Sequence, residues 1–174
     1  GKEPRETVRR RIDEALHGQK KWVLVGGPPC QAYSLAGRSR MMGNPDFEDD
    51  PRHFLYKEYL KILADHSPPV FVMENVRGLI SSKIRGRYVI KDILQDLSKP
   101  ASAFNGKHSA LEYKLYSLSH SGLMSLDADP SDFVVKAEEY GIPQARHRIF
   151  IVGIRNDIDI EPRTLKKSDT RSTV

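Results

Sequence analysis

Cysteine is nearly absent from this sequence: Cys30 is the single one among 174 residues. One thiol cannot form a disulfide within the chain, which is typical of proteins kept in a reducing compartment. His and Cys do not cluster at the spacing of a zinc site, so no metal is expected. No apolar run approaches the roughly 20 residues of a membrane helix, and no signal-peptide pattern opens the chain. We therefore expect neither a secreted disulfide scaffold nor a membrane protein.

The length and charge of the chain set further bounds. A chain of 174 residues suits one modest domain with a real core. Its 28 Lys and Arg against 23 Asp and Glu give a net charge of +5. This excess of positive charge is a mild hint of a polyanionic partner.

Hydrophobic periodicity predicts alternating strands and helices. Helices are expected from Thr7 to near Gly18, from Arg52 to before Pro68, and over residues 88–97. Strands are expected over residues 22–25, 70–73, 113–118, 133–135 and 148–154. Strand, helix and strand at this spacing are typical of parallel crossovers, so the sequence predicts an α/β fold with a mainly parallel sheet and flanking helices.

Residues whose side chains can take part in catalysis follow the first two expected strands. Cys30 comes after the first strand and two prolines, and Glu74 with Asn75 comes after the second. Ligands of open α/β sheets bind beyond the carboxyl ends of the strands, so these residues should share one rim. A stiff mounting suits a cysteine nucleophile, and a carboxyl group there is placed to carry a proton. Taken singly, an inert cysteine and a surface or helix-capping glutamate are the alternatives.

Two arginines stand at the start of the last expected strand. Arg146 and Arg148 lie two residues apart, so on a strand their side chains point to the same face. Converging guanidinium groups suit the recognition of a carboxylate, a phosphate or a base edge. Solvated edge charges are the alternative.

Three short motifs together resemble one family. They are "GPPCQ" at residues 27–31, "MENV" at residues 73–76, and "GIPQ" at residues 141–144 followed by Arg146 and Arg148. In order and spacing they resemble the cytosine-5 DNA methyltransferases, over about residues 22–154. The resemblance implies part of a Rossmann-like, S-adenosylmethionine-dependent methyltransferase domain acting on DNA.

The resemblance also implies a mechanism. The target cytosine is flipped out of the duplex, and the Cys30 thiolate adds to its carbon 6. Glu74 then acts at ring nitrogen 3, Arg148 contacts the base carbonyl, and Arg146 supports the site. Carbon 5 takes the methyl group of S-adenosyl-L-methionine, and loss of the carbon-5 proton expels Cys30.

Further roles follow from the same resemblance. Gln31, Asn75 and Gln144 are expected to support the cysteine loop. Pro29 and Leu55 match positions that line the cofactor pocket. The loop over residues 33–51 should close on DNA, with Arg38 and Arg40 meeting phosphates.

The sequence also departs from the family pattern. A Gly-rich cofactor turn near the N-terminus, the target recognition domain and the closing motif are missing, and residues 119–131 form an insertion of unknown purpose. We therefore expect a catalytic fragment that is inactive alone: a partial methyltransferase domain at 1–154 and a charged linker or tail at 155–174, leading towards the missing recognition domain. Its location would be cytoplasmic or nucleoid-associated in a bacterium, and nuclear in a eukaryote.

Two alternative functions stay open. One is an RNA cytosine-5 methyltransferase, against which Gln144 before the arginines favours the DNA branch. The other is a non-catalytic, nucleic-acid-binding remnant of the fold, which would have no need of an intact Cys30, Glu74 and Arg148.

Overall fold

The computed structural model describes residues 3–29, 55–84, 86–104 and 111–169, and the statements below concern these residues. Within these ranges the α-helices are α1 (Arg5–Leu16), α3 (Tyr56–His66) and α4 (Val89–Ser98). The main sheet contains β1 (Val23–Gly26), β2 (Val70–Val76), β5 (Tyr113–Ser117), β6 (Val134–Lys136) and β7 (His147–Arg155). A small hairpin joins β3 (Lys83–Ile84) to β4 (Arg87–Tyr88), and short 3₁₀ turns form η3 (Arg77–Ser81), η4 (Pro130–Phe133) and η5 (Ala137–Tyr140).

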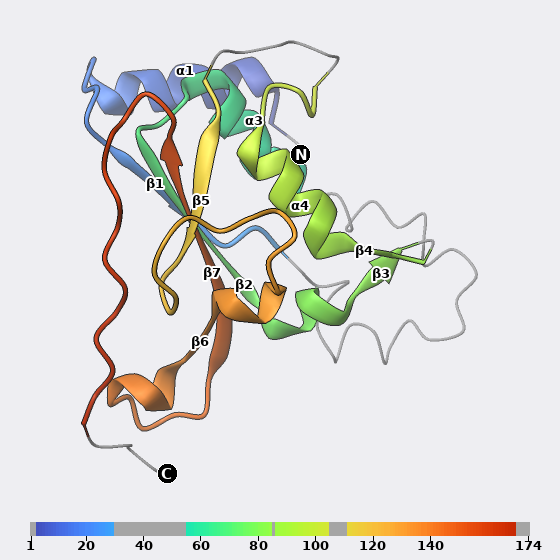
Figure 1. The fold of residues 1–174 in the computed structure, drawn as a ribbon. Helices are drawn as coiled ribbons and strands as arrows, with labels where there is room; N and C mark the ends of the chain where they lie inside the picture. The colour runs from blue at the N-terminus through green and yellow to red at the C-terminus, as the bar shows by residue number, and fades with distance from the viewer. Residues whose placement is uncertain (1–2, 30–54, 85, 105–110, 170–174) are drawn as a thin grey trace.

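The main sheet has the strand order β1-β2-β7-β5, with β6 also paired to β7 (Figure 1). β1 and β2 are parallel, and β7 is antiparallel to each of its neighbours β2, β5 and β6. The other strands therefore share one direction, and the α/β class is confirmed. The expected parallel crossover holds for β1 and β2, which α3 connects. β7 reverses because residues 137–146 join it to β6 without a crossover helix.

The two faces of this sheet differ. The covered face packs against α3 and α4, and its interior includes Leu60, Leu63, Phe71, Ile93 and Ile151. The other face, called the open face below, has no helix over it among the described residues. Its apolar side chains are Val23, Val25, Val70, Val72, Tyr116, Phe150, Val152 and Ile154.

The second strand is longer than the sequence predicts. It was expected to end at Met73, with Glu74 and Asn75 beyond it, but β2 continues to Val76. The extension arises from pairing with β7, which matches Glu74 to Phe150. The two polar residues are therefore held within the ladder rather than in a loop.

Residues 156–169 follow β7 as an extended segment along one side of the open face (Figure 1). The Leu165 amide donates to the Leu118 carbonyl at 2.8 Å, and the Ser168 amide donates to the Glu139 carbonyl at 2.9 Å. A division of the chain at residue 154 stays a prediction. Within the described residues, none of the helices has the length and hydropathy needed to cross a bilayer.

Candidate active site

The reversed direction of β7 brings Glu74 and Arg148 together. Because β7 runs against β2, its first residues lie beside the last residues of β2, with Arg148 opposite Val76. The Arg148 Nε lies 3.0 Å from Glu74 Oε1, and each side chain keeps about a third of its surface exposed or less (26% and 34%). Arg148 Nη1 also donates to the His147 carbonyl at 2.8 Å. The guanidinium is therefore held from two sides at the carboxyl end of β2.

Asn75 points the opposite way, towards the covered face. Its side chain is only 3% exposed, and Nδ2 donates to the Pro28 carbonyl at 3.4 Å. Its Oδ1 accepts from the Val76 amide at 2.8 Å. Glu74 and Asn75 are adjacent on β2, so their side chains point to opposite faces of the sheet. Glu74 contacts Arg148, whereas Asn75 donates to the carbonyl of Pro28, two residues before Cys30. The supporting role of Asn75 at the cysteine loop stays a prediction, because Cys30 lies outside the described residues.

Two glycines permit a close approach at the end of β1. A Cβ atom on Gly27 would lie 3.0 Å from Glu74 Oε2, and one on Gly26 would lie 2.7 Å from Tyr59 Cε2. The Tyr59 hydroxyl donates to the carbonyls of Leu24 and Val72, so it bridges β1 and β2. Burial raises the pKa of Tyr59 well above its usual range, which keeps this hydroxyl protonated as a donor. Sequence reasoning assigned no role to Tyr59, because its contacts depend on how α3 packs against β1 and β2.

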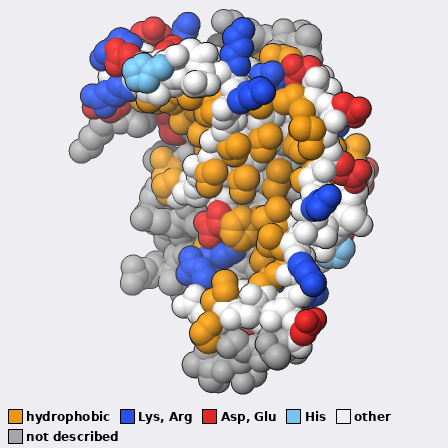
Figure 2. Space-filling view, turned by 90° about the vertical axis from the view of Figure 1, so that its left-hand side faces the viewer, with side chains coloured by type: hydrophobic (Ala, Val, Ile, Leu, Met, Phe, Trp, Pro, Cys, Tyr) orange, Lys and Arg blue, Asp and Glu red, His pale blue; other side chains and the backbone are white. Residues whose placement is uncertain are grey.

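A cavity of about 610 Å³ opens beside the Glu74–Arg148 pair. The charged residues that line it are Glu74, Arg146, Arg148 and Lys166, so the two arginines border one space although Arg146 precedes β7. The other lining residues are Leu118, Val135, Ala137, Tyr140, Ile142, Phe150 and Leu165. Figure 2 shows the open face, where hydrophobic side chains run down the centre, charged groups lie around them, and a red and blue patch borders them towards the lower end. An apolar space with a few convergent polar groups is typical of a small-molecule or base site.

A further pair of side chains, His147 and Glu138, lies beside this site. His147, between the two arginines, has its Nε2 2.6 Å from Glu138 Oε1 in η5. A hydrogen bond from its own backbone amide and the bond to His147 lower the pKa of Glu138. The pair ties η5 to the start of β7. The sequence shows a histidine between two arginines. Its contact with Glu138 could not be predicted, because it depends on how η5 folds beside β7.

The other predicted residues fall into two groups. Cys30, Gln31, Arg38 and Arg40 lie outside the described residues. Pro29 is exposed, Leu55 is half-buried, and Gln144 is exposed on the turn before β7. Within the described ranges, no group of His, Cys, Asp and Glu is arranged to hold a metal ion.

Comparison with known proteins identifies the family of the chain. The model of the C-5 cytosine-specific DNA methylase family matches residues 7–173, so the chain belongs to that family. It is 37% identical over 133 residues to the Type II methyltransferase M.AquIA of Picosynechococcus, an alignment covering 76% of this chain and 43% of that protein. It is 31% identical over 142 residues to the Type II methyltransferase M.DdeI of Desulfomicrobium norvegicum, covering 82% of this chain and 26% of that protein.

A solved structure shares the fold. It is a protein described as a DNA modification methyltransferase encoded within an E. coli prophage, with a TM-score of 0.53 and 22% identity. The match covers 95% of this chain and 38% of that one. The chain thus spans less than half the length of these relatives.

Proposed function

We propose that this chain forms the catalytic part of an enzyme that methylates carbon 5 of cytosine in DNA. The observation that carries the proposal is the Glu74–Arg148 pair at 3.0 Å beside a largely apolar cavity, next to the strand end that leads into Cys30. Family membership and relatives named as Type II methyltransferases support it, and the latter suggest a role in a restriction-modification system.

In this proposal the Cys30 thiolate attacks carbon 6 of a flipped cytosine, forming an S–C bond. The attack pushes electron density onto ring nitrogen 3 and the base carbonyl oxygen. A carboxyl group at nitrogen 3 and a guanidinium at the carbonyl stabilise that charge most where it develops, in the transition state. Glu74 and Arg148 supply these two groups side by side, with Arg146 lining the same cavity. Loss of the carbon-5 proton after methylation breaks the S–C bond and frees Cys30.

The rigid parts of the site position the nucleophile. Asn75 holds the Pro28 carbonyl, and Gly27 leaves room for the Glu74 carboxylate. In the same scheme Gln31 and Gln144 support the cysteine loop, and Arg38 and Arg40 contact DNA phosphates.

S-adenosylmethionine would supply the electrophilic methyl group, and Pro29 and Leu55 are the residues proposed to contact it. Neither residue lines any of the cavities described in this structure. The described residues therefore do not build a pocket for this cofactor. Because the chain spans less than half the length of these relatives, we expect methyl transfer to need further segments like theirs.

A capture experiment tests the proposal against its two alternatives. In 5-azacytosine a ring nitrogen replaces carbon 5, which makes carbon 6 more electrophilic and allows capture of a thiol without a methyl donor. Incubation with DNA and RNA strands containing this base, followed by mass spectrometry, should give an adduct at Cys30 with DNA. Cys30→Ser should give none, and Glu74→Gln should slow its formation by about 10² to 10⁴.

The other outcomes select the alternatives. An adduct with RNA alone would indicate an RNA methyltransferase. Binding of nucleic acid with no adduct on either strand would indicate a non-catalytic remnant.

A further inference from the structure

A second cavity lies on the other side of β6 from the candidate active site. Its volume is about 430 Å³, and its lining residues are polar or charged apart from Val134. The side chains that can donate hydrogen bonds into it are Arg77, Ser119, His120, Ser131, Lys136 and Lys167. The proposed chemistry uses none of them.

Strand β6 separates the two cavities. Val135 pairs with Arg148 and lines the apolar cavity, whereas Val134 and Lys136 line the polar one. Arg77 is the first residue after β2, so it also belongs to the rim that carries Glu74. The extended C-terminal segment also borders both cavities: Leu165 lines the apolar cavity and Lys167 lines the polar one. A ligand could therefore extend from one cavity to the other across the rim.

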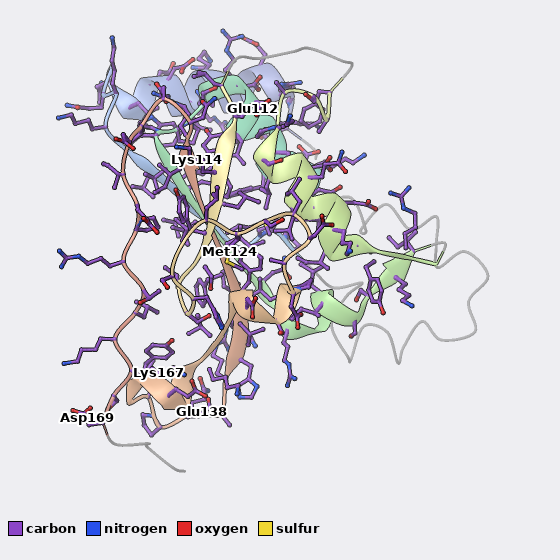
Figure 3. The ribbon with its side chains drawn as sticks, viewed as in Figure 1. Glu112, Lys114, Met124, Glu138, Lys167 and Asp169 are labelled. Atoms are coloured by element: carbon purple, nitrogen blue, oxygen red, sulfur yellow. The ribbon has the colours of Figure 1, made fainter. Side chains whose placement is uncertain are left out.

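A single carboxylate holds two of the cations in place. Glu139 Oε1 lies 3.4 Å from Lys136 Nζ, and Glu139 Oε2 lies 2.6 Å from Lys167 Nζ. Hydrogen bonding from Lys167 lowers the pKa of Glu139, so the carboxylate stays charged at neutral pH. The Glu139 side chain is only 15% exposed, while the lysines are 47% and 61% exposed. The ammonium groups thus face solvent and the carboxylate lies behind them. Figure 3 shows Lys167 on the C-terminal segment beside η5, which also carries Glu138.

The insertion over residues 119–131 forms the facing wall. Its ends meet because the hydroxyls of Ser117 and Ser119 both donate to the Asp132 carbonyl. The Asp132 carboxylate faces His120, with 3.6 Å between His120 Nε2 and Asp132 Oδ1. The insertion therefore contributes Ser119, His120 and Ser131 to a cavity that would be open without it.

We propose that this polar cavity binds a backbone phosphate of the nucleic-acid strand whose base enters the apolar cavity. Three permanent cations outweigh two carboxylates there, and each carboxylate already has a basic partner. A phosphodiester carries one negative charge and accepts hydrogen bonds from lysine, arginine and hydroxyl groups. The inference rests on the proposed action on DNA and assigns a purpose to the insertion.

The salt dependence of DNA binding tests the inference. The triple variant Arg77→Gln, Lys136→Gln, Lys167→Gln is compared with a control, Arg11→Gln, Lys20→Gln, Lys21→Gln, which removes the same charge at the far end of the sheet. Affinity for a short DNA duplex is measured by fluorescence anisotropy over a salt series. We expect the slope of log affinity against log salt to fall by about 0.9 for one lost phosphate contact in the cavity variant. The control should keep the slope of the unmodified chain.

A single substitution provides a second test in case the triple variant does not fold. Arg77→Gln breaks no ion pair within the described part of the chain and should weaken binding at low salt, equally for different DNA sequences. Equal slopes in the two triple variants, or unchanged affinity in Arg77→Gln, would overturn the inference. The 5-azacytosine adduct is read separately: an adduct without these effects overturns only the phosphate site, and these effects without an adduct overturn only the proposed chemistry.

Discussion

The two faces of the main sheet use the same strands in different ways. On β2, Phe71 and Met73 are fully buried against the helices, while Val70 and Val72, which alternate with them, are only half-buried on the open face. The alternation of a strand assigns one set of side chains to the core and leaves the other set available. At the end of the open face this second set becomes Glu74. Stability and chemistry are therefore carried by interleaved residues of one strand.

The covered face should respond most strongly to added volume. Gly153 pairs with Phe71, and a Cβ atom at Gly153 would overlap the Phe71 ring, which is itself fully buried. Gly153→Ala should therefore destabilise the fold by about 3 kcal/mol or more, because neither the ring nor the central strand can move freely. Urea unfolding followed by circular dichroism measures the loss. Stability equal to that of the unmodified chain would mean that the ring does not lie over this glycine.

Truncation of a side chain to alanine should cost more stability on the covered face than on the open face. Leu63→Ala on the covered face should cost about 2 to 5 kcal/mol, because that side chain is 1% exposed. Val72→Ala on the open face should cost about 1 kcal/mol, since its side chain is only half-buried. The same unfolding measurement compares them. Equal losses would show that something buries the open face as fully as the helices bury the other.

The sequence predicted more of the site than of the sheet. Three motifs and the rule for strand ends put Glu74, Asn75 and Arg148 at one rim, and the structure brings them there. The antiparallel direction of β7 could not be predicted, because it depends on pairing between segments far apart in the chain. The fit of Phe71 over Gly153 has the same origin. Local patterns predict elements and faces, whereas contacts across the sheet appear only when the fold brings the segments together.

The smallest effect on stability is expected at the exposed edge of the sheet. β1 pairs only with β2 among the described strands, and Val23 and Val25 are 52% and 71% exposed. Such an apolar edge favours self-association. Val25→Lys should reduce association in sedimentation experiments and change the free energy of unfolding by no more than about 0.5 kcal/mol. The matched control is Ile160→Lys, on an exposed side chain of the C-terminal segment, which should leave association unchanged.

Exchange of the cytosine carbon-5 hydrogen tests the central claim most directly. Addition of a thiolate at carbon 6 makes carbon 5 basic, so its hydrogen exchanges with water even without a methyl donor. DNA carrying tritium at carbon 5 is incubated with an excess of the chain, and release of tritium into water is counted. The chain is expected to be inactive alone only in methyl transfer, because the addition at carbon 6 needs no cofactor. The account therefore predicts release by the unmodified chain, none by Cys30→Ser, and release slowed about 10² to 10⁴-fold by Glu74→Gln. Release that Cys30→Ser leaves unchanged, or no release by the unmodified chain, would contradict it.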